Sequence, residues 1–254
     1  MPRTLLAALA LSLATAAPAL AFDPAAMNEA EKAAFGDAVR DYLMANPEVL
    51  VEAINVLEER RAADEVENDR VLVEHFRKEL FEDGHSWVGG NPQGDVTMIE
   101  FIDYRCGVCR QVYGDVEELV TSDGNIRIIY KEFPILGEES DLAARFAISV
   151  KQVAGDEAYK AAHDALMTLR GRVTLESLGG LADELKIDRK AVLDRMNTEA
   201  VTAVIRTNHQ LAEQMRIAGT PTFVVGGELL RGAPRTGLKA AVEAARKDAP
   251  AQEG

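Results

Sequence analysis

The placement of the cysteines constrains the fold and the chemistry of this chain more than any other feature does. Cys106 and Cys109, its only two cysteines, are separated by two residues. They follow an apolar run at residues 96–102, which predicts a strand, and precede a helix-like stretch at residues 110–120. A thiol at the N-terminus of a helix is acidic and reactive, because the backbone N–H groups and the helix dipole stabilise the thiolate. The motif therefore predicts an α/β unit with a reactive dithiol at the carboxyl end of a strand.

The start of the chain indicates export. Residues 1–21 have the pattern of a secretory signal peptide: a positive start with Arg3, an apolar core at residues 5–13, and a small-x-small cleavage site at residues 19–21. An uncleaved membrane anchor is the alternative, but the apolar core is shorter than the roughly 20 residues that span a bilayer. We expect a soluble mature protein in a bacterial periplasm. In an oxidising compartment a dithiol is more often catalytic than idle.

Charge limits the classes of partner. The chain has 28 Lys and Arg against 42 Asp and Glu, and a formal net charge of −14. Nucleic acids and anionic membrane surfaces are both bound by clustered basic residues, so the acidic excess argues against both. A chain of 254 residues can bury a core without structural disulfides, as one large domain or as one domain with an accessory piece.

Residues 22–84 predict a helical extension with no core of its own. Asn46 and Pro47 have the residue types of an N-cap and a first helical position, and therefore start a second helix. Its apolar face at residues 50–57 is followed by an almost wholly charged run at residues 58–70. Because a helix that is polar all round often bridges separate units, we expect an oligomerisation stalk. Packing of these helices on the catalytic domain is the alternative.

Residues 85–247 predict the catalytic domain. A glycine-rich turn at residues 89–95 separates two strands, and a second turn at residues 122–125 separates the motif helix from a further strand at residues 126–130. The order strand, helix, strand predicts a βαβ unit. Its chemistry is expected at the carboxyl end of the first strand.

The rest of the domain changes from helical to strand periodicity. Helical signals fill residues 138–215, and Ser140 is the expected N-cap of the first of these helices. A hairpin with its turn at residues 226–227 follows. A last helix at residues 236–247 and a disordered tail at residues 248–254 complete the predicted organisation.

A Cys-x-x-Cys pair is compatible with redox chemistry and with metal binding. Structural zinc needs four ligands, usually a second such pair or spaced histidines, and the four histidines of this chain form no close pair. A passive disulfide closing so short a loop adds little stability. We therefore expect redox chemistry, with no bound metal and no cofactor beyond the dithiol. The alternatives are copper(I) bound through both thiolates and a chaperone-like binding protein.

The sequence EFIDYRCGVC at residues 100–109, together with GTPTF at residues 219–223, resembles the DsbA-like family of thioredoxin-fold proteins. Within that family the chain is most similar to the suppressor-of-copper-sensitivity C and Com1-type branch, whose members are exported and have an N-terminal helical extension. The resemblance covers about residues 85–247 and, more weakly, residues 42–57. It implies an α/β, thioredoxin-like fold with an inserted helical subdomain, preceded by a helical extension.

The resemblance also implies roles for individual residues. Cys106 would be the exposed nucleophile and Cys109 the buried resolving thiol. Thr220 and Pro221 would form the loop that faces the dithiol, with a cis bond before the proline, and Thr220 would pair with a substrate strand. Glu100 would shuttle the proton of Cys109. Strand alternation independently places Glu100 on an apolar face, which suggests burial beneath the motif.

The residues between the cysteines depart from the strongly oxidising members of the family. Gly107 and Val108 include no histidine, so we expect a milder acidity at Cys106 and a weaker oxidant. This favours a disulfide isomerase or reductase acting on client proteins, with a DsbA-like oxidase as the alternative. A membrane reductase would have to keep an isomerase reduced, and a membrane oxidase would serve the alternative. By resemblance we expect a homo-oligomer, a trimer ahead of a dimer.

Overall fold

The computed structural model describes residues 27–234 and 237–248. The expected signal peptide at residues 1–21 and nearly all of the expected tail at residues 248–254 lie outside this range. The chain divides into two compact units, Met1–Glu59 and Arg60–Gly254. Among the described residues, no helix combines the length and the apolar character needed to cross a membrane.

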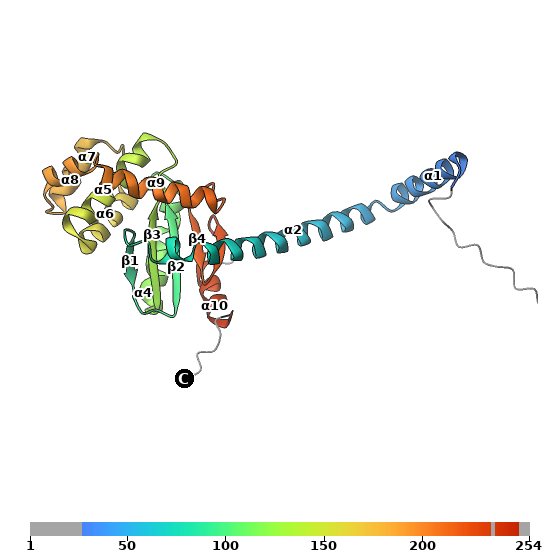
Figure 1. The fold of residues 1–254 in the computed structure, drawn as a ribbon, viewed down its shortest axis with the longest axis horizontal. Coiled ribbons are helices and arrows are strands. Elements are labelled where there is room, and N and C mark those ends of the chain that lie inside the picture. The colour runs from blue at the N-terminus through green and yellow to red at the C-terminus, as the bar shows by residue number, and fades with distance from the viewer. Residues whose placement is uncertain (1–26, 235–236, 249–254) are drawn as a thin grey trace, which may run out of the picture. The chain divides into compact units, whose positions relative to one another are not determined.

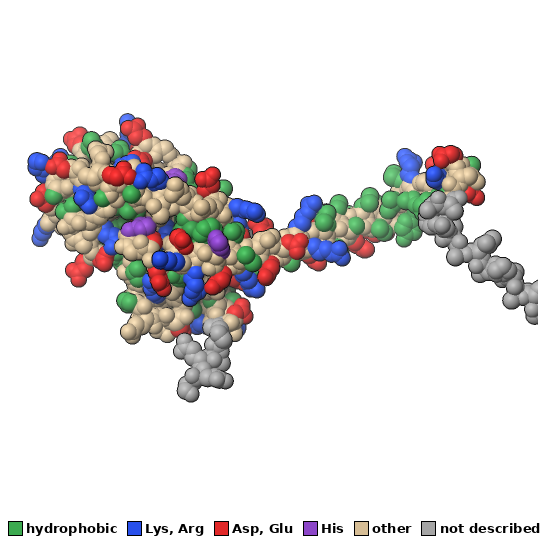
Figure 2. All heavy atoms as spheres, in the orientation of Figure 1, with side chains coloured by type: hydrophobic (Ala, Val, Ile, Leu, Met, Phe, Trp, Pro, Cys, Tyr) green, Lys and Arg blue, Asp and Glu red, His purple; other side chains and the backbone are tan. Residues whose placement is uncertain are grey.

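The first unit is helical and has no buried side chain among its described residues. Helix α1 (Glu29–Ala45) begins with a capping box, in which Asn28 and Glu31 each bond the other's backbone N–H group. Helix α2 (Glu48–His75) starts directly after Pro47, close to the predicted position, whereas Asn46 is the C-cap residue of α1. Large apolar side chains are exposed along both helices, namely Val39, Tyr42, Met44, Leu50, Val51, Ile54, Val56 and Leu57. Figure 2 shows hydrophobic side chains in green along the helices of this unit.

The second unit is built on a five-stranded mixed sheet with the order β1-β3-β2-β4-β5. Its strands are β1 (Trp87–Gly90), β2 (Val96–Ile102), β3 (Ile126–Glu132), β4 (Thr222–Val225) and β5 (Glu228–Arg231). Strands β2 and β3 are parallel and the other pairs are antiparallel. Helix α4 (Gly107–Asp123) joins β2 to β3, which confirms the predicted βαβ unit (Figure 1).

Five helices lie between β3 and β4 in the sequence and gather largely at one end of the sheet (Figure 1). They are α5 (Glu138–Ala154), α6 (Asp156–Thr168), α7 (Leu175–Glu184), α8 (Arg189–Arg195) and α9 (Glu199–Gln214). The last described helix, α10 (Leu238–Asp248), follows the β4–β5 hairpin, close to its predicted position. The α/β fold class is therefore confirmed.

The first helix of this block starts earlier than predicted. Its N-cap is Gly137, and Ser140 lies inside α5, buried and with no hydrogen-bond partner for its hydroxyl. The prediction of Ser140 as the N-cap was therefore wrong. Three acidic residues in the first turn stabilise the helix start through the helix dipole, so this start does not depend on a side-chain cap.

The sheet has a hydrophobic core on each face. Along β2, Met98 and Ile102 point into the core formed with the helices that include α4 to α8, whereas Ile99 and Phe101 point into the second core. This alternation is the expected consequence of the two-residue period of a strand.

The second core places the boundary of the extension differently from the prediction. We expected the extension to run to residue 84, but the second compact unit begins at Arg60. Val73 near the end of α2 and Leu80 of α3 (Arg77–Phe81) are buried in the second core beside residues of β2 and α9. Because their burial removes apolar surface from water, this part of the predicted extension belongs to the catalytic unit.

Candidate active site

The loop between β2 and α4 is held by the side chain of Asp103. Its Oδ1 accepts the N–H of Arg105 at 2.8 Å, and its Oδ2 accepts the N–H groups of Ile135 at 2.8 Å and Leu136 at 3.1 Å. Its backbone carbonyl accepts the N–H of Cys106 at 3.0 Å. Asp103 therefore fixes the segment that carries the first thiol. Asp103 was not predicted from the sequence, although a polar residue between the end of a strand and the motif was a usable signal.

The two thiols lie at the start of α4 and differ in accessibility. Cys106 is the N-cap residue of α4 and Cys109 lies in its first turn. Cys106 is 7% exposed and Cys109 is 0% exposed. Cys109 is therefore buried, as the resemblance implied, but Cys106 is less exposed than expected. The thiol of Cys106 donates a hydrogen bond to the carbonyl oxygen of Thr220 at 3.1 Å, because the loop that contains Thr220 covers it.

The surroundings of Cys106 favour its thiolate. Burial raises the pKa of Cys106, but this effect is outweighed by hydrogen bonds to the thiolate from the side chains of Thr220 and Cys109 and from the backbone of Val108 and Cys109. The pKa of Cys106 is therefore held below its usual value. This is the effect predicted for a thiol at a helix N-terminus.

Cys109 is in the opposite situation. Burial raises the pKa of the Cys109 thiol far above its usual value, and the nearby charges of Glu100 and Cys106 add to this effect. Cys109 therefore stays protonated until a base takes its proton.

Glu100 is the buried acid of the site. It is 3% exposed, on β2, with its backbone paired to Tyr130 of β3 on one side and to Phe223 of β4 on the other. Burial raises the pKa of Glu100 to about 8, helped by the charges of Glu117 and Cys106. The predicted burial of Glu100 is confirmed, and a carboxyl that titrates near neutral pH can both accept and release a proton.

The loop before β4 completes the site. The Thr220–Pro221 peptide bond is cis, as the resemblance implied. The carbonyl oxygen of Pro221 accepts the N–H of Gly232 at 2.9 Å, and the hydroxyl of Thr222 donates to the carbonyl oxygen of Gly219 at 2.8 Å. The structure thus brings Cys106 and Thr220 together, although 114 residues separate them in the sequence.

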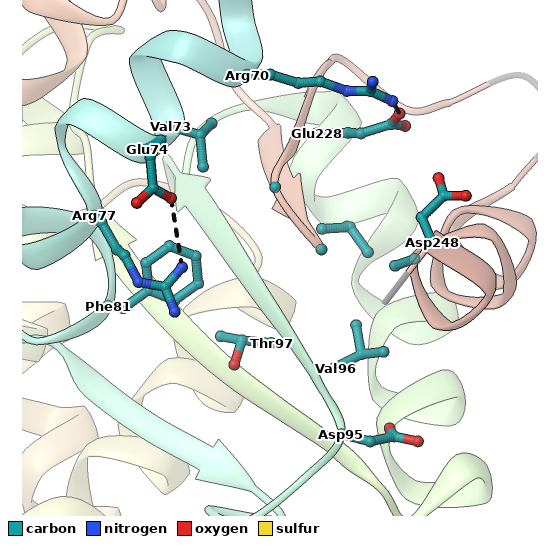
Figure 3. A pocket seen from close by; sticks show the side chains of 14 residues that line it. Arg70, Val73, Glu74, Arg77, Phe81, Asp95, Val96, Thr97, Glu228 and Asp248 are labelled. Carbon is teal, nitrogen blue, oxygen red and sulfur yellow. Dashed lines mark hydrogen bonds and ion pairs between the residues drawn. The ribbon is translucent and has the colours of Figure 1, made fainter. Parts of the chain in front are cut away.

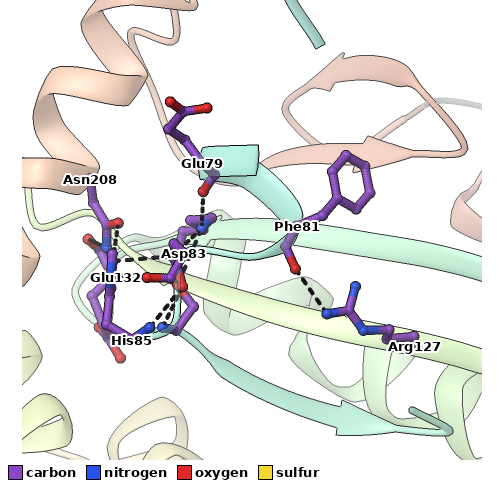
Figure 4. A network of polar contacts seen from close by, with 9 residues as sticks. Glu79, Phe81, Asp83, His85, Arg127, Glu132 and Asn208 are labelled. Carbon is purple, nitrogen blue, oxygen red and sulfur yellow. Dashed lines mark hydrogen bonds and ion pairs between the residues drawn. The ribbon is translucent and has the colours of Figure 1, made fainter. Parts of the chain in front are cut away.

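A polar network supports the sheet on its second face (Figure 4). The buried ammonium of Lys131 on β3 bonds Asp83 and donates to the carbonyl oxygen of Glu79 at 2.7 Å. Burial raises the pKa of Asp83, but the charge and hydrogen bond of Lys131 dominate and lower it to about 2. The network fastens the segment after α3 to β3, and therefore belongs to the scaffold.

One cavity is not lined by either thiol. It has a volume of about 750 Å³ and is lined by α2, α3, the start of β2, the β4–β5 turn and α10 (Figure 3). Its charged side chains largely pair with one another: Arg70 with Glu228 at 2.7 Å and Arg77 with Glu74 at 3.8 Å. A smaller cavity of about 360 Å³ borders Thr220 and Pro221.

Comparison with known proteins identifies the family. A family model described as the DSBA-like thioredoxin domain matches residues 97–240, more than half of the chain. The chain belongs to this family. A model described as the copper resistance protein ScsC N-terminal domain matches residues 31–64, so the resemblance to the suppressor-of-copper-sensitivity C branch is confirmed. The thioredoxin-like fold class is confirmed with it.

Solved structures of similar proteins cover most of the chain. A thioredoxin-like oxidoreductase from Silicibacter pomeroyi is 41% identical, with a TM-score of 0.63, and the match covers 68% of this chain and 99% of that one. ScsC of Proteus mirabilis, in a transitional conformation, is 26% identical with a TM-score of 0.62, and the match covers 86% of this chain and 98% of that one.

Among curated relatives, the Na(+)/H(+) antiporter NhaA 1 of Salinispora arenicola is 29% identical over 146 residues. This match covers 57% of the present chain but only 22% of the antiporter. The chain thus spans about a fifth of the length of that relative, and the two share one domain rather than a whole-protein architecture.

Proposed function

We propose that this protein is a periplasmic thiol:disulfide oxidoreductase that exchanges disulfides with client proteins, chiefly as an isomerase or reductase. The main support for the proposal is the difference between its two thiols, since the pKa of one is lowered and the pKa of the other is raised. Cys106 has a lowered pKa beside Thr220, whereas Cys109 is buried and stays protonated, with its pKa raised further by the charge of Glu100. The dithiol is itself the redox centre and needs no further cofactor.

In the first step the Cys106 thiolate attacks one sulfur of a client disulfide. A new S–S bond joins Cys106 to the client, and the second client sulfur leaves as a thiolate. The Thr220 carbonyl, which holds the Cys106 thiol in the free protein, lies where a client strand would pair beside the mixed disulfide.

The mixed disulfide then has two outcomes. In reduction, Glu100 takes the proton of Cys109, and the Cys109 thiolate attacks the sulfur of Cys106. The client leaves as a second thiolate, and the client has gained the two electrons that the dithiol has lost. In isomerisation a different client thiolate attacks instead, and Cys106 is released unchanged.

The residues between the cysteines favour isomerisation over oxidation. Gly107 and Val108 provide no imidazole to stabilise the thiolate further, so the disulfide form is a milder oxidant. An isomerase must be kept reduced, and we propose a membrane reductase as its redox partner. A strongly oxidising protein would instead need a membrane oxidase.

Assembly into a homo-oligomer, a trimer ahead of a dimer, is part of the proposal. Ile54 and Leu57 of α2 belong to the exposed apolar surface of the first unit, which has no core among its described residues. Copies of the same helices would cover this surface. Several dithiols could then act on one client.

The test is isomerase activity on a client with scrambled disulfides, measured for the wild type, for an Ile54→Asp/Leu57→Asp variant and for a Glu58→Gln control on the same helix. We expect strong activity from the wild type and the control, a lower mass in light scattering for the double variant, and reduced activity with it. Cys106→Ser should be inactive.

Other outcomes identify the alternatives. Rapid oxidation of a reduced client without isomerisation would mean a DsbA-like oxidase. Stoichiometric copper(I) binding that is lost in Cys106→Ser, with no turnover of either client, would mean a metal-binding module. An unchanged mass in the double variant would contradict assembly through α1 and α2.

A further inference from the structure

Three potential metal ligands, none of them a cysteine, meet at the interface of α4 and α6. Glu117 of α4 and His163 and Asp164 of α6 each offer a ligand atom, and these atoms lie within 4.8 Å of one another. This is the one such cluster found among the described residues. Two carboxylates close together are common on protein surfaces, so the histidine is what distinguishes this cluster.

His163 is held in one tautomer. Its Nδ1 lies 3.2 Å from the hydroxyl oxygen of Tyr104, and that hydroxyl donates its own hydrogen to Glu132 at 2.8 Å. The Tyr104 oxygen can therefore only accept from Nδ1–H, which leaves a lone pair on Nε2. His163 is fully buried, and Nε2 has no hydrogen-bond partner. A buried, unpaired imidazole lone pair beside two carboxylates is a metal-ligand arrangement.

The carboxylates are also oriented by tyrosines. The hydroxyl of Tyr130 donates to Glu117 at 3.0 Å, and the hydroxyl of Tyr113 donates to Asp164 at 2.7 Å. Tyr130 also stacks on the ring of His163, with centroids 4.2 Å apart. Such contacts, which fix a ligand through its second polar atom or its ring, are typical of metal sites.

The ammonium of Lys160 marks the position of a cation in this cluster. Its Nζ lies 2.9 Å from Glu117 and 2.6 Å from Asp164. The Lys160 side chain is 29% exposed, and both it and Glu117 line an open cavity of about 330 Å³. The flexible lysine can therefore swing into solvent and leave the two carboxylates beside the His163 ring, with one ligand atom from each residue within 4.8 Å of the others.

We propose that Glu117, His163 and Asp164 form a zinc site, which Zn²⁺ occupies by displacing the ammonium of Lys160. Imidazole nitrogen and carboxylate oxygen are ordinary ligands of Zn²⁺, and three protein ligands leave the fourth tetrahedral position for water. The site uses neither cysteine, although the charge of Glu117 also contributes to the raised pKa of Glu100. The sequence suggested no metal site because Glu117 and His163 come from helices far apart in the chain.

The test is a calorimetric zinc titration of the full-length protein with its cysteines oxidised to the disulfide, so that no thiolate competes for the metal. Lys160→Met removes the competing ammonium and keeps the two carboxylates. We expect it to bind zinc about tenfold more tightly than the wild type, since even a modest Coulomb term of about 1.4 kcal/mol is a tenfold change. Lys151→Met is the matched control, because Lys151 pairs with Asp156 elsewhere on the surface.

Loss of the ligands completes the test. In the Lys160→Met background, Asp164→Asn should weaken binding by about tenfold or more, and His163→Gln should abolish it. If His163→Gln does not fold, as judged by near-ultraviolet circular dichroism, X-ray absorption of the zinc-loaded Lys160→Met protein replaces it and should show one imidazole ligand. Zinc binding to Lys160→Met that is no tighter than to Lys151→Met, or that survives Asp164→Asn unchanged, would overturn the proposal.

Discussion

At the scale of single residues, burial and hydrogen bonding decide what each titratable group does. Cys106 and Cys109 have the same chemistry and lie one helical turn apart, yet the pKa of one is lowered and that of the other is raised. The difference arises because donors surround Cys106, whereas burial dominates at Cys109. Glu100 shares the apolar environment of Cys109 and has a raised pKa for the same reason.

The raised pKa of Glu100 predicts a cost in stability at neutral pH. Its folded-state pKa of about 8 exceeds the ordinary value of 4.5, so the folded protein binds more protons than the unfolded chain between these values. Stability therefore falls as pH rises through this window. We expect Glu100→Gln to raise the free energy of unfolding at pH 7 by a few kcal/mol, on the order set by 1.4 kcal/mol per pKa unit, and to have little effect at pH 4.

Urea unfolding between pH 4 and pH 9 measures this effect. Glu118→Gln, on the exposed face of α4, is the control and should leave the pH profile unchanged. Glu132 is also buried, and burial raises its pKa to about 8, so the slope of stability with pH should be reduced rather than removed in Glu100→Gln. A profile identical to that of the wild type would contradict the burial of a neutral Glu100.

At the scale of elements, the connection from β2 to α4 brings the nucleophile to the loop before β4. Strand β2 supplies Glu100, and the N-terminus of α4 supplies hydrogen-bond donors for Cys106. Asp103 lies between them and holds the connecting loop by accepting the N–H of Arg105. Asp103 also accepts a hydrogen bond from Ile135 in the segment after β3. Because β2 and β3 are parallel, the segments that follow them leave the sheet at the same edge, which allows this contact.

Replacing Asp103 should loosen this connection. Asp103→Ala leaves the half-buried N–H of Ile135 without its acceptor, which costs up to about 1–3 kcal/mol, whereas water can replace the acceptor of the N–H of Leu136, an exposed residue. We also expect slower alkylation of Cys106 at pH 7, because the thiol is no longer held among its donors. Urea unfolding and the pH dependence of alkylation measure the two effects. Asp115→Ala, at an exposed position on α4, should change neither.

At the scale of the whole molecule, the catalytic unit begins within α2 rather than after the predicted extension. The end of α2 and α3 contribute Val73 and Leu80 to the second core, and Asp69 of α2 forms a bidentate pair with Arg231 of β5. One helix thus belongs partly to the unit without a core and partly to the unit that carries the dithiol.

Two truncations test this boundary. A chain starting at Arg60 should unfold in urea with nearly the stability of the catalytic unit in the full chain. A chain starting at His85 lacks Val73 and Leu80, and should be less stable by several kcal/mol, at about 1.5–3 kcal/mol for each fully buried apolar side chain. Equal midpoints for the two truncated chains would contradict the assignment of residues 60–84 to the catalytic unit.

The sequence by itself determined the features whose signals are local. The strand before Cys106, the helix after it, the βαβ order and the hairpin after Pro221 all follow from periodicity and turn residues over short windows. The burial of Glu100 follows from the two-residue period of its strand. The prediction of Ser140 as an N-cap was wrong although it used a local signal. Helix α5 begins after Gly137, where acidic residues in its first turn stabilise the helix start.

Only the tertiary structure decided the features that join distant segments. It placed Thr220 over Cys106, which limits the exposure of that thiol, and it buried the end of the predicted extension in the second core. It also brought Glu117 to His163 across the interface of α4 and α6. Short windows of sequence do not predict such contacts, because the contacts depend on which faces of separate elements pack together.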